Sequence, residues 1–282
     1  MKAVVADAVT RVLCLRVVPI TGSAIYLTDH PVPLVMGGHT YLSTSGYEFT
    51  GYHSTAGFAP GSIDLQGIAG AAGISRAAIA SGLFDGARCY CFATSWAAPV
   101  EDEEAIVCGL FGKARMEDDR YRIEGLSLID ALATVRNDQF TAQCTKVFLS
   151  QGFAGCLVPA AANTVTGTLT HVSSASQFRD STRGEAADIF GAGTIRFTSG
   201  ANAGLSAQEI RSHAADGTLV VFEPFFFLPT VGDAYEMIRG CRKRLADCQA
   251  RWNGSSTYNN VVNFGGFPYV PTGSTYGKFG QK

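Results

Sequence analysis

Cysteine is the residue type in this chain best able to do chemistry, and the chain has eight of them. Cys241 and Cys248 stand seven positions apart. On a continuous helix this spacing places both side chains on nearly one face, with about 10.5 Å of rise between them. The Cα atoms of a disulfide lie within about 7 Å of each other, so a helix would exclude that bond here. The spacing instead suits two thiolates that reach one bulky metal cluster.

A second pair, Cys144 and Cys156, lies in the segment QCTKVFLSQGFAGC. Gly152 and Gly155 let the backbone fold back, which would bring both thiolates to one place. Four thiolates are the usual ligand set of an iron–sulfur cluster. Zinc is an alternative, although structural zinc sites favour closely spaced C-x₂₋₄-C pairs. Ordinary buried cysteines are another, because free cysteine is among the most buried residue types. The spacing alone leaves all three open.

The other four cysteines fit no catalytic motif. Cys89 and Cys91 alternate around Tyr90 in a strand-like run, so both should face one side as small core residues. Cys14 and Cys108 lie inside apolar runs and are expected to be buried in the same way. The sequence also has no G-x-S-x-G, H-E-x-x-H or Walker motif, which leaves a hydrolase hypothesis without residues to support it.

Few of the polar residues suggest a site. Asp29 and His30, with His39 nearby, are more typical of a hydrogen-bonded turn than of a metal or acid–base pair. The run Glu101–Glu104 predicts a solvated acidic loop. Three further histidines have no partner at ligand spacing: His53, His171 and His213.

Composition limits the partners. Apolar side chains make up 46% of the 282 residues and charged ones only 16%. This composition predicts a sizeable core and a protein that functions in a complex with others. The net charge of −2 and the single basic run Arg242–Arg244 give no footprint for specific nucleic-acid binding. Asp7, Arg11 and Arg16 interrupt the apolar N-terminus, and no apolar run approaches the roughly 18 residues of a membrane span. We therefore expect assembly in a cytoplasm and no stable membrane insertion.

The pattern along the chain predicts a mainly β fold with a few short helices, a β-rich α+β protein. Strand-like runs between residues 12 and 68 are separated by turn residues, as in a small barrel or sandwich. A short helix is expected within residues 71–86, with Gly82 at its end. Three strand-like runs follow, at residues 87–96, 104–117 and 119–132, and Asp118–Asp119 should form the hairpin turn between the last two.

The second half is expected to begin near Asn137, which divides the chain into a β-domain at 1–136 and a C-terminal domain at 137–282. Its first part should be strands and loops. Beyond Gly232–Asp233, the pattern predicts a helix that carries both Cys241 and Cys248. Residues 260–280, rich in Gly, Pro and aromatics, should form an extended segment packed on something else.

Four segments of the sequence resemble a known family. They are LTDHPVPL at 27–34, GGHTYLSTSGYEFT at 37–50, IASGLFDGARCYCFATSW at 79–96, and the ending GDAYEMIRGCRKRLADCQARWNGSSTYNNVVNFGGFPYVP at 232–271. The most specific part is Gly240–Cys241, then Cys248, then Asn263–Pro268. Over nearly its whole length the chain resembles the phage tail tip hub proteins of lambda-like siphophages, Mu-like siphophages and gene transfer agents.

The resemblance implies a structural component of the tail tip and not an enzyme. It implies a tube-like β hub domain and a C-terminal domain that binds a four-iron cluster through Cys144, Cys156, Cys241 and Cys248. It also implies a homotrimeric ring in the virion that joins the distal tail protein to the central fibre protein, and it leaves a contact with the tape measure protein open. The alternatives are a tail-associated cell-wall hydrolase and a zinc-stapled binding module.

Overall fold

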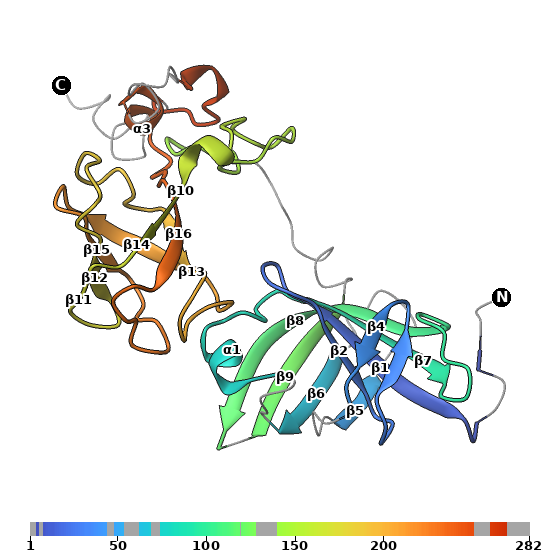
Figure 1. Cartoon of the computed structure of the whole chain (residues 1–282). Coiled ribbons are helices and arrows are strands. Elements are labelled where there is room, and N and C mark those ends of the chain that lie inside the picture. The colour runs from blue at the N-terminus through green and yellow to red at the C-terminus, as the bar shows by residue number, and fades with distance from the viewer. Residues whose placement is uncertain are drawn as a thin grey trace. The chain divides into compact units, whose positions relative to one another are not determined.

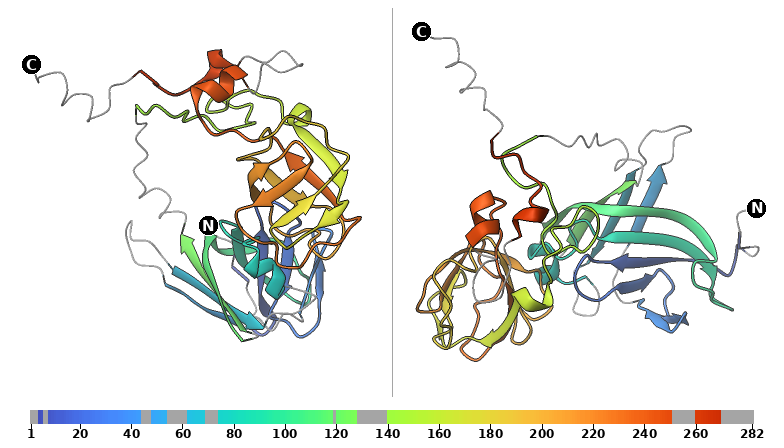
Figure 2. Two further views of the ribbon diagram at one scale, coloured as in Figure 1. Left: turned by 90° about the vertical axis from the view of Figure 1, so that its left-hand side faces the viewer. Right: turned by 90° about the horizontal axis from the view of Figure 1, so that it is seen from above.

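The computed structural model describes residues 4–5, 8–43, 48–53, 62–68, 74–118, 120–127, 140–250 and 260–269. The chain divides into two compact units, residues 1–135 and 136–282. Strands dominate both units (Figures 1 and 2), so the predicted mainly β fold with a few short helices is confirmed. Residues 128–132 of the third predicted strand and residues 270–282 lie outside the described part.

The N-terminal unit is built on a curved, fully antiparallel sheet of seven strands (Figure 1). In spatial order the strands are β2 (Ile25–Thr28), β1 (Arg11–Val18), β7 (Arg88–Ser95), β8 (Glu104–Glu117), β9 (Arg120–Ser127), β6 (Ser62–Ile68) and β5 (Glu48–His53). A separate hairpin pairs β3 (Leu34–Met36) with β4 (His39–Tyr41).

The hairpin covers one face of the strand pair β1–β7. Inward side chains from β1, β7 and the hairpin meet there. Cys14 on β1 is paired with Phe92 on β7. Both belong to one buried group with the hairpin residues Leu34, Met36 and Tyr41. The rings of Tyr41 and Phe92 meet edge to face, with centroids 5.7 Å apart. This small core is what the alternating apolar pattern of the first strand requires.

The predicted helix and hairpin turn are both present. The helix α1 (Arg76–Ala80) begins at Ser75, whose side chain accepts the Ala78 N–H at 3.1 Å, as an N-cap does. Gly82 ends it at a φ of 73°, as predicted. Asp118 turns the chain between β8 and β9 at a φ of 53°, while Asp119 lies outside the described residues.

The C-terminal unit holds a second antiparallel seven-stranded sheet. Its order is β10 (Thr164–Thr168), β16 (Ala234–Ile238), β13 (Thr194–Phe197), β14 (Gln208–His213), β15 (Thr218–Val221), β12 (Gln177–Arg179) and β11 (His171–Val172). The two end strands, β10 and β11, are consecutive in the chain, with only Leu169 and Thr170 between them. The sheet therefore curls round until its two edges belong to one bent strand, which makes a small barrel.

The barrel is filled with large apolar side chains. Eleven buried residues form one cluster, and they include Phe178, Phe190, Phe197 and Tyr235. A polar network also reaches inside, because the Tyr235 hydroxyl donates to Asp180 at 2.6 Å and the Asp180 side chain is fully buried. The barrel is thus a self-contained core, to which the cysteine-bearing segments are added.

The helix predicted beyond Gly232–Asp233 was wrong over most of its length. Ala234–Ile238 is strand β16, because Tyr235 and Met237 both point into the barrel core and the strand pairs with β10 and β13. A helix, α3 (Leu245–Ala250), starts only after Lys243, which has a left-handed φ of 63°. Cys248 lies on α3, but Cys241 precedes it, so the two do not share a helix face.

Two 3₁₀ turns complete the described elements, η1 (Ala161–Asn163) and η2 (Val261–Asn263). In the part of the chain that the structure describes, no helix has the length and apolarity to span a bilayer.

Candidate metal centre

The four predicted cysteines lie together in the C-terminal unit. Cys156 and Cys248 are buried in one apolar cluster with Val158, and Cys241 packs against that cluster. Cys144 lies alongside, since its backbone N–H donates to the carbonyl of Lys243 at 2.8 Å. The four residues chosen from the sequence therefore lie near one another, and their role as metal ligands stays a prediction.

The electrostatics of the thiols reflect the same grouping. Burial, followed by the like charge of thiolates at Cys241, Cys144 and Cys156, raises the pKa of Cys248 to about 12. The pKa of Cys241 is also raised, mainly by burial, with an added contribution from the neighbouring Cys144. Without a metal, Cys241 and Cys248 are therefore neutral thiols at pH 7, and any metal that binds there must displace their protons.

The loop between Cys144 and Cys156 doubles back as its glycines predicted. The N–H of Val147 donates to Ala154 at 2.8 Å, and the N–H of Cys156 donates back to the Val147 carbonyl at 3.0 Å. Gly155 has no room for a side chain, because a Cβ would collide with the backbone carbonyl of Ser150. Gly152 has space around it, so only one of the two glycines is required by the fold.

The Gly240–Cys241 motif has a packing reason. Gly240 is the second residue after β16 and lies against the turn Gly191–Gly193, where a Cβ would collide with the Gly191 carbonyl oxygen. Close backbone contact at this point brings Cys241 up against the end of the barrel. The buried Asp247 then accepts the Arg242 N–H at 3.0 Å, which fixes the short turn that leads into α3.

The residues present fit an iron–sulfur cluster. The donor set is four thiols from separate segments, enclosed by apolar side chains that include Phe148, Val261 and Phe264. Among the described residues, no group of three or more His, Cys, Asp and Glu could hold a metal ion as the side chains stand. The donor chemistry thus allows an iron–sulfur cluster or a zinc ion, because thiolates bind both.

A second segment contributes to the centre, and sequence analysis did not assign it a role. Asn260, which is buried, donates from its side chain to the Cys156 carbonyl at 2.8 Å and from its backbone to the Cys248 carbonyl at 3.3 Å. The only hint in the sequence is its place in the ending that resembles the hub family, three residues before Asn263.

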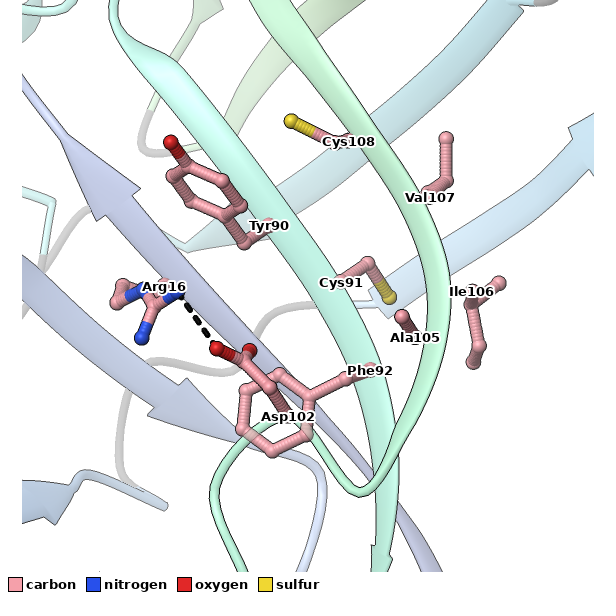
Figure 3. A pocket seen from close by; sticks show the side chains of 9 residues that line it. All are labelled: Arg16, Tyr90, Cys91, Phe92, Asp102, Ala105, Ile106, Val107 and Cys108. Carbon is pink, nitrogen blue, oxygen red and sulfur yellow. Dashed lines mark hydrogen bonds and ion pairs between the residues drawn. The ribbon is translucent and has the colours of Figure 1, made fainter. Parts of the chain in front are cut away.

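The cavity of about 440 Å³ in the N-terminal unit, drawn in Figure 3, lacks the features of a reactive site. Arg16 lies 4.7 Å from the centre of the Tyr90 ring and forms ion pairs with Glu101 at 2.8 Å and Asp102 at 2.9 Å, so its charge is already balanced. Burial raises the pKa of Cys91, which lines the same cavity, to about 12, which leaves a poor nucleophile.

The prediction of a solvated loop at Glu101–Glu104 holds for the exposed Asp102 but not for the three glutamates, which are half-buried and paired. Glu101 also accepts the Tyr41 hydroxyl at 2.8 Å, Glu103 accepts the Thr94 hydroxyl at 2.8 Å, and Glu104 pairs with Arg11 at 3.2 Å. The loop is anchored to the sheet because these partners, on β1, β4 and β7, each present a donor at its base. Its charge run therefore serves packing within the unit.

The remaining predictions for the N-terminal unit hold with one exception. Cys14, Cys89 and Cys91 are buried, whereas Cys108 is only half-buried, because it is paired with Tyr90 and lies on the opposite face from Cys89. Asp29 forms the predicted turn and accepts the Leu13 N–H at 2.9 Å. The side chain of His53 lies outside the description.

The fold and the family comparisons together identify a structural protein of the phage tail. Residues 1–158, more than half of the chain, match the family described as baseplate hub protein, N-terminal attachment domain. The chain belongs to this baseplate hub family, as the sequence resemblance predicted, and is a component of the virion. Residues 188–273 match a second family, described as phage conserved hypothetical protein BR0599.

A solved structure shares the fold. A chain in the virion of a native gene transfer agent particle matches with a TM-score of 0.75 and 21% sequence identity, over 93% of this chain and 89% of that one. No curated protein matches the sequence.

Proposed function

We propose that this baseplate hub protein joins the distal tail protein to the central fibre protein as a homotrimeric ring, and that a four-iron cluster on Cys144, Cys156, Cys241 and Cys248 stabilises its C-terminal unit. The observation that supports the iron–sulfur group is the position of the four thiols. They come from three stretches of the chain and lie around one group of buried apolar side chains. The same proposal includes a contact with the tape measure protein.

The region around the four cysteines has too small an apolar core to be stabilised by packing alone. Its buried apolar core consists of Cys156, Val158 and Cys248, against eleven residues in the adjoining barrel. A bound cluster would supply four metal–thiolate bonds, and structural metals contribute folding free energy directly where a core is too small. The chain's own residues form the enclosure, since the apolar side chains around the thiols limit the access of water.

The role that we propose is structural and not enzymatic. In the N-terminal unit, burial raises the pKa of both Cys89 and Cys14 to about 11, and that of Cys91 to about 12, so these thiols stay protonated at neutral pH. A thiol in that state is inert as a nucleophile. No contact described for the chain favours the alternative of a cell-wall hydrolase.

Metal analysis of protein purified without oxygen tests the cluster. About four irons and four acid-labile sulfides, with visible absorption, are expected in the parent and in a Cys108→Ser control. The double variant Cys241→Ser, Cys248→Ser should have none. One zinc in a colourless parent would support the zinc-stapled module instead, and no metal would make the four thiols core residues.

The hub assignment needs its own experiment. Purified protein should form trimers by light scattering and should capture the distal tail protein from a matched tail extract. A protein that stays monomeric with every tail component would contradict the ring, whatever metal it binds.

A further inference from the structure

The four thiols of the candidate centre are supplied by stretches that no shared sheet holds together. Cys144 and Cys156 belong to an irregular loop, Cys241 follows β16, and Cys248 lies on α3, which is six residues long. A site that is ready to bind needs another element to fix these stretches at the right separation. The segment Asn260–Tyr269 contacts three of the four.

Asn260 joins the Cys156 loop to α3. Its side-chain amide donates to the backbone carbonyl of Cys156 at 2.8 Å, and its backbone N–H donates to the carbonyl of Cys248 at 3.3 Å. Both carbonyls belong to the cysteines themselves, so the two bonds act directly at the ligand positions. Asn260 is 6% exposed, which shields these bonds from competing water.

The orientation of the Asn260 amide is fixed from the other side. Asn263 donates from its side chain to the Asn260 side-chain oxygen at 2.8 Å and from its backbone to the Asn260 carbonyl at 3.0 Å. With its oxygen occupied in this way, the amide nitrogen of Asn260 points at Cys156. Each of the four polar atoms of this asparagine therefore has a hydrogen-bond partner, which offsets the cost of its burial.

The same segment reaches Cys144. The backbone N–H of Gly265 donates to the Cys144 sulfur at 3.3 Å, and the Thr145 hydroxyl donates to the Gly265 carbonyl at 3.1 Å. The contacts of Asn260 and Gly265 thus cover Cys156, Cys248 and Cys144.

We propose that Asn260 is the positioning residue of the thiol site, which holds Cys156 and Cys248 at a fixed separation before any metal arrives. The identity of the metal group rests on the proposed function. The positioning is a property of the metal-free chain and can be tested without the cluster.

The test is pulse alkylation of the reduced, metal-free, full-length protein, with the rate at each cysteine read by mass spectrometry. In Asn260→Ala, Cys156 should react about tenfold faster than in the parent, because its carbonyl loses the buried side-chain donor, whereas Cys248 keeps its backbone bond to residue 260 and should change less. Asn260→Asp should also expose Cys156, since a carboxylate cannot donate to its carbonyl. Val262→Ser, in the same turn but 94% exposed, is the matched control and should behave as the parent does.

Cys89 and Cys91 of the N-terminal unit provide an internal reference for global unfolding. Their rates should not change in any of these variants. An equal rate at Cys156 in the parent and in Asn260→Ala would overturn the proposal. So would a parallel rise at all buried cysteines, because Asn260 would then act only on overall stability.

Loading with iron and sulfide separates this proposal from the proposed function. If the parent takes up a cluster, Asn260→Ala should load several-fold more slowly and reach the same final iron content. If the parent takes up no iron, the cluster proposal fails, while the alkylation rates still decide the role of Asn260.

Discussion

The two units of this protein hold four cysteines each, and they use them in different ways. Those of the N-terminal unit lie on adjacent paired strands, where the sheet register alone sets their positions, and Cys14 is directly opposite Phe92. Those of the C-terminal unit lie on loops, at a strand end and on a six-residue helix. Where a sheet already fixes the backbone, a cysteine is a small core residue. Where no regular structure fixes the backbone, a metal group bound by several cysteines would hold the segments together.

Removing the metal should break this contrast most strongly. We expect treatment of the loaded protein with an iron chelator to abolish the hydrogen-exchange protection of residues 140–160 and 240–250, a loss of several kcal/mol of local stability. The sheet of the N-terminal unit should keep its protection, because its cysteines take no part in the site. Equal loss in both units would contradict the division.

The next largest effect on stability is expected from Gly240→Ala. The added Cβ would meet the backbone carbonyl of Gly191, which cannot move without disturbing the barrel end, so we expect a loss of about 3 kcal/mol in the free energy of unfolding. Gly184→Ala, at a position with nothing within 4 Å, is the matched control and should change little. Denaturant unfolding followed by circular dichroism measures both. A benign Gly240→Ala would show that Cys241 is not held by this contact.

Within the N-terminal sheet, the hypothesis that cysteines are apolar core residues can be sharpened at Cys91. Cys91→Ser buries a hydroxyl in place of a thiol and should destabilise the unit by about 1–3 kcal/mol, while Cys91→Ala should cost less. Iron content should be normal in both variants. Thermal unfolding and metal analysis provide the two readouts, and iron loss in either variant would mean that the units share a site.

The smallest expected effect is a pH dependence of the barrel centred on His213. The ring is 3% exposed beside Phe190, and burial lowers its pKa below the ordinary 6.5, against the opposing charges of Glu185 and Asp188. The unfolded chain takes up a proton near pH 6.5 while the folded ring stays neutral. The stability of the barrel should therefore fall as the pH drops below about 6.5.

This dependence can be isolated from that of the barrel carboxylates. Asp180 and Glu185 have lowered pKa values, so the stability that they contribute is lost only at more acid pH, below their unfolded values of 3.8 and 4.5. Melting of the parent and a His213→Phe variant between pH 7 and pH 5 should show a fall in the parent alone. An equal slope in the variant would assign the effect to other groups.

Much of the architecture was visible in the sequence. The turn residues and apolar alternation predicted the N-terminal strands, because Gly82 and Asp118 mark local events that depend only on nearby backbone. The glycines between Cys144 and Cys156 predicted the return of that loop, whereas the helix expected to join Cys241 and Cys248 was wrong and the set of four came from the family resemblance. The error in β16 arose because five residues with two inward side chains are too few to separate a strand from a helix.

What could not be predicted depends on residues far apart in the chain. The anchoring of Glu101 and Glu104 pairs them with Arg16 and Arg11, 85 and 93 positions away. The role of Asn260 depends in the same way on Cys156, 104 positions earlier. Neither distance leaves a local pattern, so charge and amide groups of this kind are predicted as surface until the fold is known.

The position of Asn260 late in the chain also determines when, during translation, the thiol site can form. A growing polypeptide emerges at about 5–20 residues per second, and its leading domains fold first. The sheet of the N-terminal unit can form early, but Cys144 must wait more than a hundred residues, on the order of ten seconds, for Asn260 and Gly265 to be made. During that interval Cys144 and Cys156 lack their contacts with Gly265 and Asn260, so we expect the thiol site to close only after that segment has been translated.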